Sequence, residues 1–372
     1  MKNGDFNIIL PGNIEVGEGK FSLLKSRING KRAFVICSES AYNFNKKIID
    51  EICGSNCRLY FASKGEPTVT SVDMAVNCSR EFESDIIVGI GGGSVLDTAK
   101  AVAAMYGNQG SVIQYLELSG YNNRLTCPPL KWLAVPTTSG TGSECTKNAV
   151  ISGNGFKKSL RDDRLIADYI ILDSNFMVDV PTETTVISGV DCISQLLESY
   201  LSAKSNIFTD ILAINAVKLT SVLKEVYKHP YDRNLRLKMA LAASISGITL
   251  ANAGLCAVHG IANLFSEKYK IRHGTACGVL LPHILYYTEK ANLIKSKNLY
   301  YALGGKGVYR EHSLTLLMQS LLSELNFPAK FDNSLSESDL EDISEKALYL
   351  QKNNPVKLTK EQINDIIKKI IF

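Results

Sequence analysis

The chain has 372 residues, more than a single compact core usually holds, so two domains are expected. Its 41 basic and 37 acidic residues are interspersed and leave a net charge of only +4, which gives no indication of a nucleic-acid or membrane partner. Neither a bilayer-spanning segment nor a signal peptide is expected, because no apolar run is long enough. The nine scattered cysteines include no CxxC pair, so we expect reduced thiols in a cytoplasmic protein.

The first half of the chain alternates between strand and helix patterns. Short β-rich runs predict strands at 32–38, 57–63, 85–90, 132–138 and 169–173. Helical spacing between these runs predicts helices at 40–53, 70–83 and 94–107. The run 85–90 is apolar throughout, as in a strand that is buried on both faces. The alternation predicts an α/β domain, a parallel sheet with flanking helices, over residues 1–180.

The pattern changes after Asp173 to long helical segments with few strand signals. Pro181 and Thr182 suit the start of a helix, and a helical pattern follows them. Further helical segments are predicted at 206–227, 234–254, 312–325, 338–350 and 359–372. We therefore expect an all-α second domain over residues 181–372.

A glycine-rich turn, GIGGGSVLDTAK at 89–100, joins a predicted strand to a predicted helix. Gly91, Gly92 and Gly93 allow a sharp turn and a close approach of the backbone to a ligand. The helix that begins near Ser94 presents unpaired N–H groups that suit a pyrophosphate. However, Ser94 replaces the last glycine of GxGxxG, and the turn follows about two βα units, so an ordinary Rossmann order is not expected. Alone, such a turn fits a structural loop without a ligand equally well.

A second loop, AVPTTSGTGSE at 134–144, follows another predicted strand. It offers hydroxyls and free backbone N–H groups, which together form a polar cradle. Its hydroxyl residues are Thr137, Thr138, Ser139, Thr141 and Ser143. Although a solvated turn would also fit, two such loops on one α/β sheet predict a nucleotide across the carboxyl ends of the strands.

The helical half contains a candidate metal site. Asp191 and Gln195 are spaced i, i+4 in GVDCISQLLESY, so they share one face of an apolar helix. His259 and His273 are fourteen positions apart, and each precedes a glycine. A carboxylate with two imidazoles suits a divalent transition metal, and a metal would offset the cost of a buried carboxylate.

These segments resemble one known family when they are taken together. The motifs GGGSVLDTAK, VPTTSGTGSE, YIILDSNFMVDVPTETTVISGVD and VHGIANLFSEKYKIRHGTACGVLLPH are similar to those of the iron-containing (group III) alcohol dehydrogenases, nearly from end to end. The resemblance implies a dinucleotide-binding domain over 1–180, a metal- and substrate-binding domain over 181–372, and an active site between them. It also implies hydride transfer between a nicotinamide and a carbon that bears oxygen.

The resemblance assigns the metal ligands. Asp191, His259 and His273 match three family ligands. Gln195 stands where the alcohol dehydrogenases usually have a further histidine, and it is the candidate for the fourth ligand, although its amide oxygen is a weak, neutral donor. Asn263 also departs from the family, because many members carry a histidine there that is suspected of proton transfer. We expect one divalent metal, either iron or zinc, and no acid–base residue is assigned.

The resemblance also assigns contacts to the dinucleotide. In the first loop these are Gly91, Gly92, Gly93, Ser94 and Asp97. In the second loop they are Thr137, Thr138 and Thr141, and Lys158 lies near a family lysine that approaches the cofactor. Ser38 stands where NAD-preferring members have an aspartate. A serine there tolerates the 2′-phosphate of NADP whereas Glu39 beside it does not, so NADP and NAD both remain open.

The expected activity is that of a metal-dependent, NAD(P)-linked alcohol dehydrogenase or aldehyde reductase that acts on a small alcohol or aldehyde. Two alternatives on the same fold are an enzyme like dehydroquinate synthase, which would need a richer cluster of basic residues, and one like glycerol dehydrogenase. A third is a nucleotide-binding protein with a decayed metal site, which the substitutions at Gln195 and Asn263 would explain. We expect a homodimer, as is common among relatives.

Overall fold

The computed structural model describes residues 5–121, 123–153, 155–332 and 336–371. The chain divides into two compact units. We call Ile9–Pro181 together with Tyr231–Ser244 the sheet unit, and Thr182–Pro230 together with Ile245–Phe372 the helical unit, which also includes the residues before Ile9.

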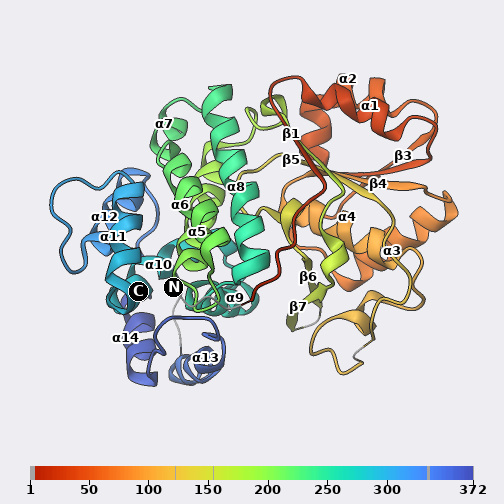
Figure 1. The fold of residues 1–372 in the computed structure, drawn as a ribbon. Helices are drawn as coiled ribbons and strands as arrows, with labels where there is room; N and C mark the ends of the chain where they lie inside the picture. The colour runs from red at the N-terminus through yellow and green to blue at the C-terminus, as the bar shows by residue number, and fades with distance from the viewer. Residues whose placement is uncertain (1–4, 122, 154, 333–335, 372) are drawn as a thin grey trace. The chain divides into compact units, whose positions relative to one another are not determined.

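The sheet unit is built on a six-stranded parallel sheet of order β1-β8-β5-β4-β2-β3 (Figure 1). Its strands are β1 (Asn13–Val16), β2 (Ala33–Cys37), β3 (Cys57–Phe61), β4 (Ile86–Gly91), β5 (Trp132–Pro136) and β8 (Tyr169–Leu172). Five of these were predicted, and the parallel α/β fold is confirmed. The sixth, β1, was missed because its four residues carry no apolar run and are ordered by pairing with β8.

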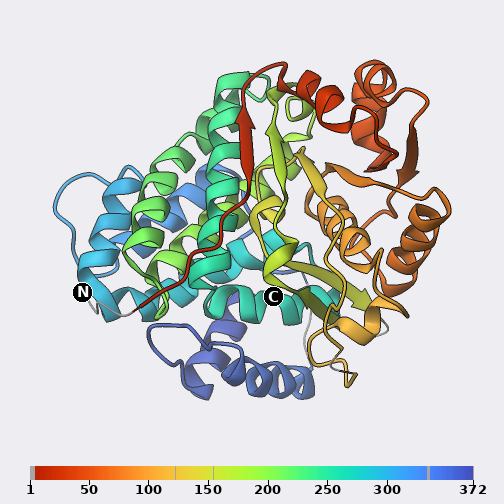
Figure 2. The ribbon, with the colours of Figure 1, turned by 45° about the vertical axis from the view of Figure 1, so that its right-hand side comes forward.

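Four helices flank this sheet. They are α1 (Leu23–Ile28), α2 (Glu39–Cys53), α3 (Val69–Glu81) and α4 (Gly93–Met105). In Figure 1, α1 and α2 lie on one face of the sheet and α3 and α4 on the other; Figure 2 gives a second view. Strands β2, β4 and β5 are buried along their whole length, as their continuous apolar sequences require.

The order of the strands reverses direction between β2 and β4. From β2 the chain moves outward to β3, and it then returns past β2 to β4 and β5. In open α/β sheets such a switch point is where ligands bind, at the carboxyl ends of the strands. The loops that begin at Ser38 and Gly92 leave the sheet on the two sides of this point.

An antiparallel hairpin, not predicted from the sequence, belongs to the sheet unit. It consists of β6 (Asn148–Gly153) and β7 (Phe156–Arg161), with Gly153 paired to Phe156 at its tip.

The helical unit consists of helices, as predicted, although no helix was predicted between residues 255 and 311. They are α5 (Thr182–Leu201), α6 (Ile207–Thr220), α7 (Leu223–Lys228), α9 (Ala257–Tyr269), α10 (His273–Thr288), α11 (Leu293–Ala302), α12 (Ser313–Glu324), α13 (Glu337–Tyr349) and α14 (Lys360–Ile370). Helix α8 (Arg233–Ala253) belongs to both units, because the division falls after Ser244. The predicted helix 206–227 is interrupted at Ser221 and forms two helices, α6 and α7.

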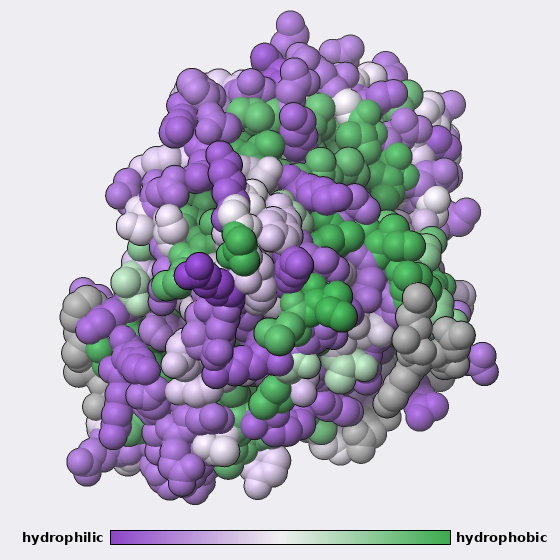
Figure 3. Space-filling view, turned by 60° about the vertical axis from the view of Figure 1, so that its left-hand side comes forward, coloured by the Kyte–Doolittle hydropathy of each residue, from purple (hydrophilic) through white to green (hydrophobic). Residues whose placement is uncertain are grey.

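Among the described residues, no single helix has both the length and the hydropathy needed to cross a membrane. Only α8 and α9 together reach that length and hydropathy, and the chain bends by 105° between them. On the face of the molecule shown in Figure 3, polar side chains surround several separate apolar patches.

Candidate metal centre and nucleotide loops

Three helices of the helical unit bring four metal-binding side chains together. Asp191 comes from α5, His259 from α9, and His273 and Cys277 from α10; one ligand atom of each lies within 4.8 Å of the others. We call these four residues the metal cluster. Asp191 Oδ1 lies 3.4 Å from His259 Nε2 and 3.9 Å from His273 Nε2, and Cys277 Sγ lies 3.5 Å from His273 Nε2.

Two glycines on α10 allow this convergence. A Cβ atom at Gly274 would lie 2.6 Å from the carbonyl oxygen of Ile187 on α5, and one at Gly278 would lie 2.7 Å from a methyl group of Val190. Helices α5 and α10 can therefore pack closely only where these side chains are absent. His273 and Cys277 each precede one of the glycines, so the close contact carries both side chains toward Asp191.

The donor atoms of the metal cluster are buried and fit a divalent cation. Asp191 and His259 are 3% and 5% exposed, respectively. Within the described part of the chain, neither Asp191 Oδ1 nor His259 Nε2 makes a hydrogen bond of good geometry. An unpaired carboxylate oxygen and an unpaired ring nitrogen are costly in a protein interior. A cation between them would satisfy both, so the residues present fit a metal site.

Glu198 orients His259. Glu198 and Cys277 are the two residues of this site that were not predicted from the sequence. The Glu198 carboxylate accepts a hydrogen bond of 2.6 Å from His259 Nδ1 and another of 2.6 Å from the backbone N–H of Val258 at the start of α9. A carboxylate on Nδ1 fixes the tautomer in which Nε2 is free for a metal. The signal was present in the sequence, because Glu198 follows Asp191 by seven positions, about two helical turns.

Gln195 lies beside the metal cluster, and both ends of its amide are engaged. Its Oε1 accepts a hydrogen bond of 3.1 Å from the Ser246 hydroxyl, and its Nε2 donates one of 3.4 Å to Asp191 Oδ2. The second predicted departure, Asn263, is exposed on α9.

The charges in the metal cluster are mutually stabilising. Burial opposes ionisation of Asp191, yet the close contact with His259 and the charges of both histidines hold the pKa of that carboxyl below its ordinary value. Burial also acts against a charged His259, but Cys277, Asp191 and Glu198 raise its pKa well above normal. Burial raises the pKa of the Cys277 thiol to about 12. Without a metal, an ionised Asp191 is therefore stabilised by a protonated His259, and a divalent metal would replace the proton on His259 Nε2.

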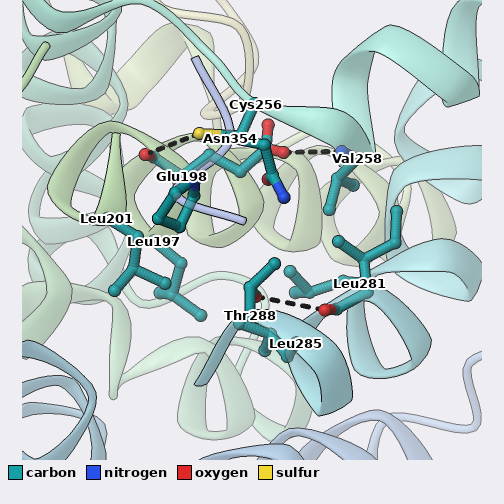
Figure 4. Close-up of a pocket in the computed structure, with 11 residues that line it drawn as sticks. Leu197, Glu198, Leu201, Cys256, Val258, Leu281, Leu285, Thr288 and Asn354 are labelled. Atoms are coloured by element: carbon teal, nitrogen blue, oxygen red, sulfur yellow. Dashed lines mark hydrogen bonds between the residues drawn. The ribbon is translucent and has the colours of Figure 1, made fainter. Parts of the chain in front are cut away.

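Glu198 also lines a small cavity in the helical unit (Figure 4). It is lined mainly by apolar side chains, among them Leu197, Val258 and Leu281. Its volume of about 10 Å³ corresponds to roughly one water molecule, so it is too small for a substrate.

In the sheet unit, the two predicted polar loops contact each other. We call Gly91–Ser94 and Thr137–Ser143 together the nucleotide loops. A Cβ atom at Gly92 would lie 3.2 Å from the Thr138 hydroxyl, and one at Gly93 would lie 2.7 Å from that of Thr141. Helix α4 begins after Gly92 without a side-chain cap. Its first N–H groups and the threonine hydroxyls therefore form a cradle that fits a pyrophosphate.

Two charged residues of α4 hold the second loop in place. Asp97 accepts hydrogen bonds from the Ser143 hydroxyl and from the backbone N–H of Val150. The buried Lys100 ammonium lies within 2.7–3.2 Å of oxygen atoms of Ser143, Thr146 and Asn148, and burial lowers its pKa to about 8. Both oxygens of Asp97 are thus already engaged within the protein.

The remaining predicted cofactor residues lie in defined positions. The Ser38 hydroxyl accepts a hydrogen bond of 3.1 Å from the backbone N–H of Ala41 and so caps α2. Glu39 is exposed, and its carboxylate lies 3.5 Å from the Lys64 ammonium. Lys158 lies on β7, and its ammonium donates a hydrogen bond to the carbonyl of Leu118.

A doubly wound sheet with a phosphate cradle, together with a helical unit that carries a buried carboxylate–imidazole cluster, defines a metal-dependent dinucleotide enzyme. Comparison with known proteins then gives the family. Residues 11–174 match the family model for iron-containing alcohol dehydrogenase, and residues 185–371 match that for the C-terminal part of the Fe-containing alcohol dehydrogenase family. The chain therefore belongs to the iron-containing alcohol dehydrogenase family.

Individual relatives agree with this assignment. The chain is 31% identical over 312 residues to the long-chain-alcohol dehydrogenase 1 of Geobacillus thermodenitrificans, covering 81% of this chain and 78% of the relative. It is 26% identical to the NADPH-dependent butanol dehydrogenase of Clostridium saccharobutylicum, covering 98% and 97%. The structure of the alcohol dehydrogenase from Oenococcus oeni superposes with a TM-score of 0.91 at 26% identity, covering 98% of this chain and all of that one.

Family membership confirms the predicted class of enzyme. The protein is an NAD(P)-linked oxidoreductase that acts on CH–OH groups, and its family uses one divalent metal.

Proposed function

We propose that this enzyme interconverts small alcohols and aldehydes at a metal held by Asp191, His259 and His273, and that the nucleotide loops bind its NAD(P). One observation carries the proposal: Asp191 Oδ1 and His259 Nε2, both buried, face each other at 3.4 Å, and His273 Nε2 lies 3.9 Å from the same oxygen. Three donors from three helices converge in this way when they share a cation.

The bound groups would supply the chemistry: the cation polarises the oxygen of the substrate, and the nicotinamide exchanges hydride with its carbon. The protein's own residues position these groups. Glu198 holds His259 in one tautomer through Nδ1, and Gln195 Nε2 steadies Asp191 through Oδ2, which leaves Oδ1 and Nε2 directed into the site. Asn263 offers no titratable group, so we propose that the proton leaves by another route, through water or the cofactor ribose.

The nucleotide loops support the cofactor part of the proposal. The start of α4 has no side-chain cap, and the side chains of Thr138 and Thr141 lie so close to Gly92 and Gly93 that a Cβ at either glycine would crowd them. We assign the pyrophosphate to Gly91, Gly92, Gly93 and Ser94 with Thr137, Thr138 and Thr141. Asp97 acts through the loop that it braces, and Lys158 lies on the adjoining hairpin.

The coenzyme preference is proposed to favour NADP, because Ser38 carries no negative charge at the end of β2. Ser38→Asp tests this assignment, since aspartate keeps a capping oxygen for α2 while it repels a 2′-phosphate. The kcat/KM for NADPH should fall by about ten-fold, roughly 1.4 kcal/mol, with little change for NADH. An equal loss for both coenzymes would contradict the assignment.

The activity is tested by elemental analysis of the purified protein, joined to assays of NADH and NADPH oxidation with a panel of small aldehydes. Chelation should abolish turnover, and a single divalent metal should restore it. An active protein that contains no metal and is indifferent to chelators would refute the proposal.

We further propose a cytoplasmic homodimer. The nine free cysteines, all in described segments, support a reducing compartment.

A further inference from the structure

The metal cluster contains a fourth possible donor, Cys277, in addition to the three ligands proposed above. Cys277 lies one helical turn after His273 on α10, with its Sγ 3.5 Å from His273 Nε2. Its side chain is fully buried, and its Sγ lies within 4.8 Å of donor atoms of Asp191, His259 and His273. In the described segments, these four residues form the only group of three or more His, Cys, Asp or Glu side chains spaced for a metal ion.

Gln195, the other candidate for the fourth ligand, is held away from this role. Its amide oxygen accepts a hydrogen bond from the Ser246 hydroxyl, and its amide nitrogen donates a hydrogen bond to Asp191 Oδ2. Reversing the amide would place its oxygen against the carboxylate of Asp191, where two acceptors would repel each other. Gln195 therefore serves Asp191 as a hydrogen-bond donor.

Three of the six distances between the four donors can be compared with those of a tetrahedral ion, and the other three are at most 4.8 Å. With Zn–N and Zn–O bonds of about 2.0–2.2 Å and a Zn–S bond of about 2.3 Å, neighbouring ligand atoms lie about 3.3–3.6 Å apart. The distances of 3.4 Å from His259 to Asp191 and 3.5 Å from Cys277 to His273 fall in this range, and that of 3.9 Å from His273 to Asp191 is slightly longer. His273 is the least buried member, with 24% of its side chain exposed.

From this geometry we propose that the Cys277 thiolate is the fourth metal ligand of this enzyme, and that it makes the site one for zinc in place of iron. The proposal rests on the metal-dependent function above. On binding, the Cys277 thiol gives its proton to solvent and forms one S–metal bond. Asp191 and Cys277 then carry two negative charges against the two positive charges of the ion. Thiolate with imidazole is a donor set that zinc prefers, and catalytic zinc can expand to five ligands during turnover.

Cobalt substitution tests the proposal on the full chain. The protein is stripped with a chelator and reconstituted with Co²⁺, and its absorption spectrum is recorded. A thiolate ligand produces a sulfur-to-cobalt charge-transfer band in the near ultraviolet, which oxygen and nitrogen ligands do not. Wild type should bind one Co²⁺ per chain and show the band. Cys277→Ser should lose the band and bind zinc at least about 100-fold more weakly.

Cys192→Ser is the matched control, because Cys192 is also buried in the helical unit, on α5, and lies outside the metal cluster. It should keep both the band and the metal affinity, and circular dichroism checks that both variants are folded. One bound Co²⁺ without the band in wild type would overturn the role of Cys277 and leave the three-ligand dehydrogenase intact. Failure of wild type to bind any divalent metal would overturn both proposals.

Discussion

The nucleotide loops and the metal cluster present binding groups of different kinds. In the loops, backbone N–H groups and small hydroxyls form the cradle, and glycines are needed because any Cβ at 92 or 93 would meet Thr138 or Thr141. In the metal cluster, long side chains from three helices supply every donor atom. A site of backbone groups depends on chain geometry and resists change, whereas one or two substitutions can alter a site of side chains.

The two family departures follow this distinction. Gln195 and Asn263 both lie on helices of the helical unit, whereas the glycines and threonines expected in the loops are all present. Cys277 lies where a side chain can add a donor without any change of backbone. A single substitution can therefore add or remove a donor in the metal cluster, whereas the cradle depends on the backbone of both loops.

The largest expected effect comes from removing the central ligand. Asp191→Ala should abolish metal retention and lower kcat by at least about 10³-fold, because several kcal/mol of transition-state stabilisation depend on the ion. Elemental analysis and steady-state kinetics measure both, and cofactor affinity should stay within about two-fold because the loops are built separately. A variant that retains metal and turnover would show that Asp191 is not a ligand.

The next largest effect is expected from Lys100, whose ammonium group is hydrogen-bonded to the second loop. Lys100→Met should lower the free energy of unfolding by about 3 kcal/mol, because the buried oxygens of Ser143, Thr146 and Asn148 lose their donor. Urea unfolding measures the loss, and metal content should not change. The exposed Lys64→Met is the control and should cost less than about 0.5 kcal/mol. Equal stabilities would mean that the loop does not depend on Lys100.

A smaller effect is expected from the carboxylate that orients His259. Glu198→Gln should weaken metal binding by about 10- to 100-fold, because the amide supports the required tautomer less well than a carboxylate. Competition with a chromophoric chelator measures the change. Glu51→Gln, an exposed carboxylate on α2, should leave affinity unchanged. If both variants bind metal like wild type, the His259–Glu198 contact has no role in the site.

The smallest effect tests the backbone cradle. Gly93→Ala should raise the dissociation constant of NAD(P)H by about ten-fold, since the new Cβ would lie 2.7 Å from the Thr141 hydroxyl, while metal content stays at the wild-type level. Fluorescence titration measures the binding. Adding Thr141→Ala relieves the crowding and should recover part of the loss. Unchanged binding in the single variant would argue that the dinucleotide does not use this turn.

Most of the elements could be predicted because their signals are local. Continuous apolar runs marked β2, β4 and β5, and helical patterns marked α5, α6, α7, α8, α12, α13 and α14, but no helix was predicted for the stretch that forms α9, α10 and α11. Strand β1 escaped prediction because it is ordered by pairing with β8, far away in the chain. The β6–β7 hairpin was missed although Gly153 and Gly155 lie between its two strand sequences, which is a local turn signal. Asp191, His259 and His273 could be proposed from residue type and family motif, and the structure places them together.

The sequence by itself determined two kinds of local pattern. These are the glycine-rich turn at the end of β4 and the candidate ligands on apolar helices, and both can be recognised because propensity and periodicity act over a few residues. Only the tertiary structure decided which side chains lie together in the metal cluster. The close packing of α10 on α5 at Gly274 and Gly278 adds Cys277 to the cluster, while Ser246 and Asp191 engage Gln195. Such choices depend on distances between helices, which no local pattern in the chain encodes.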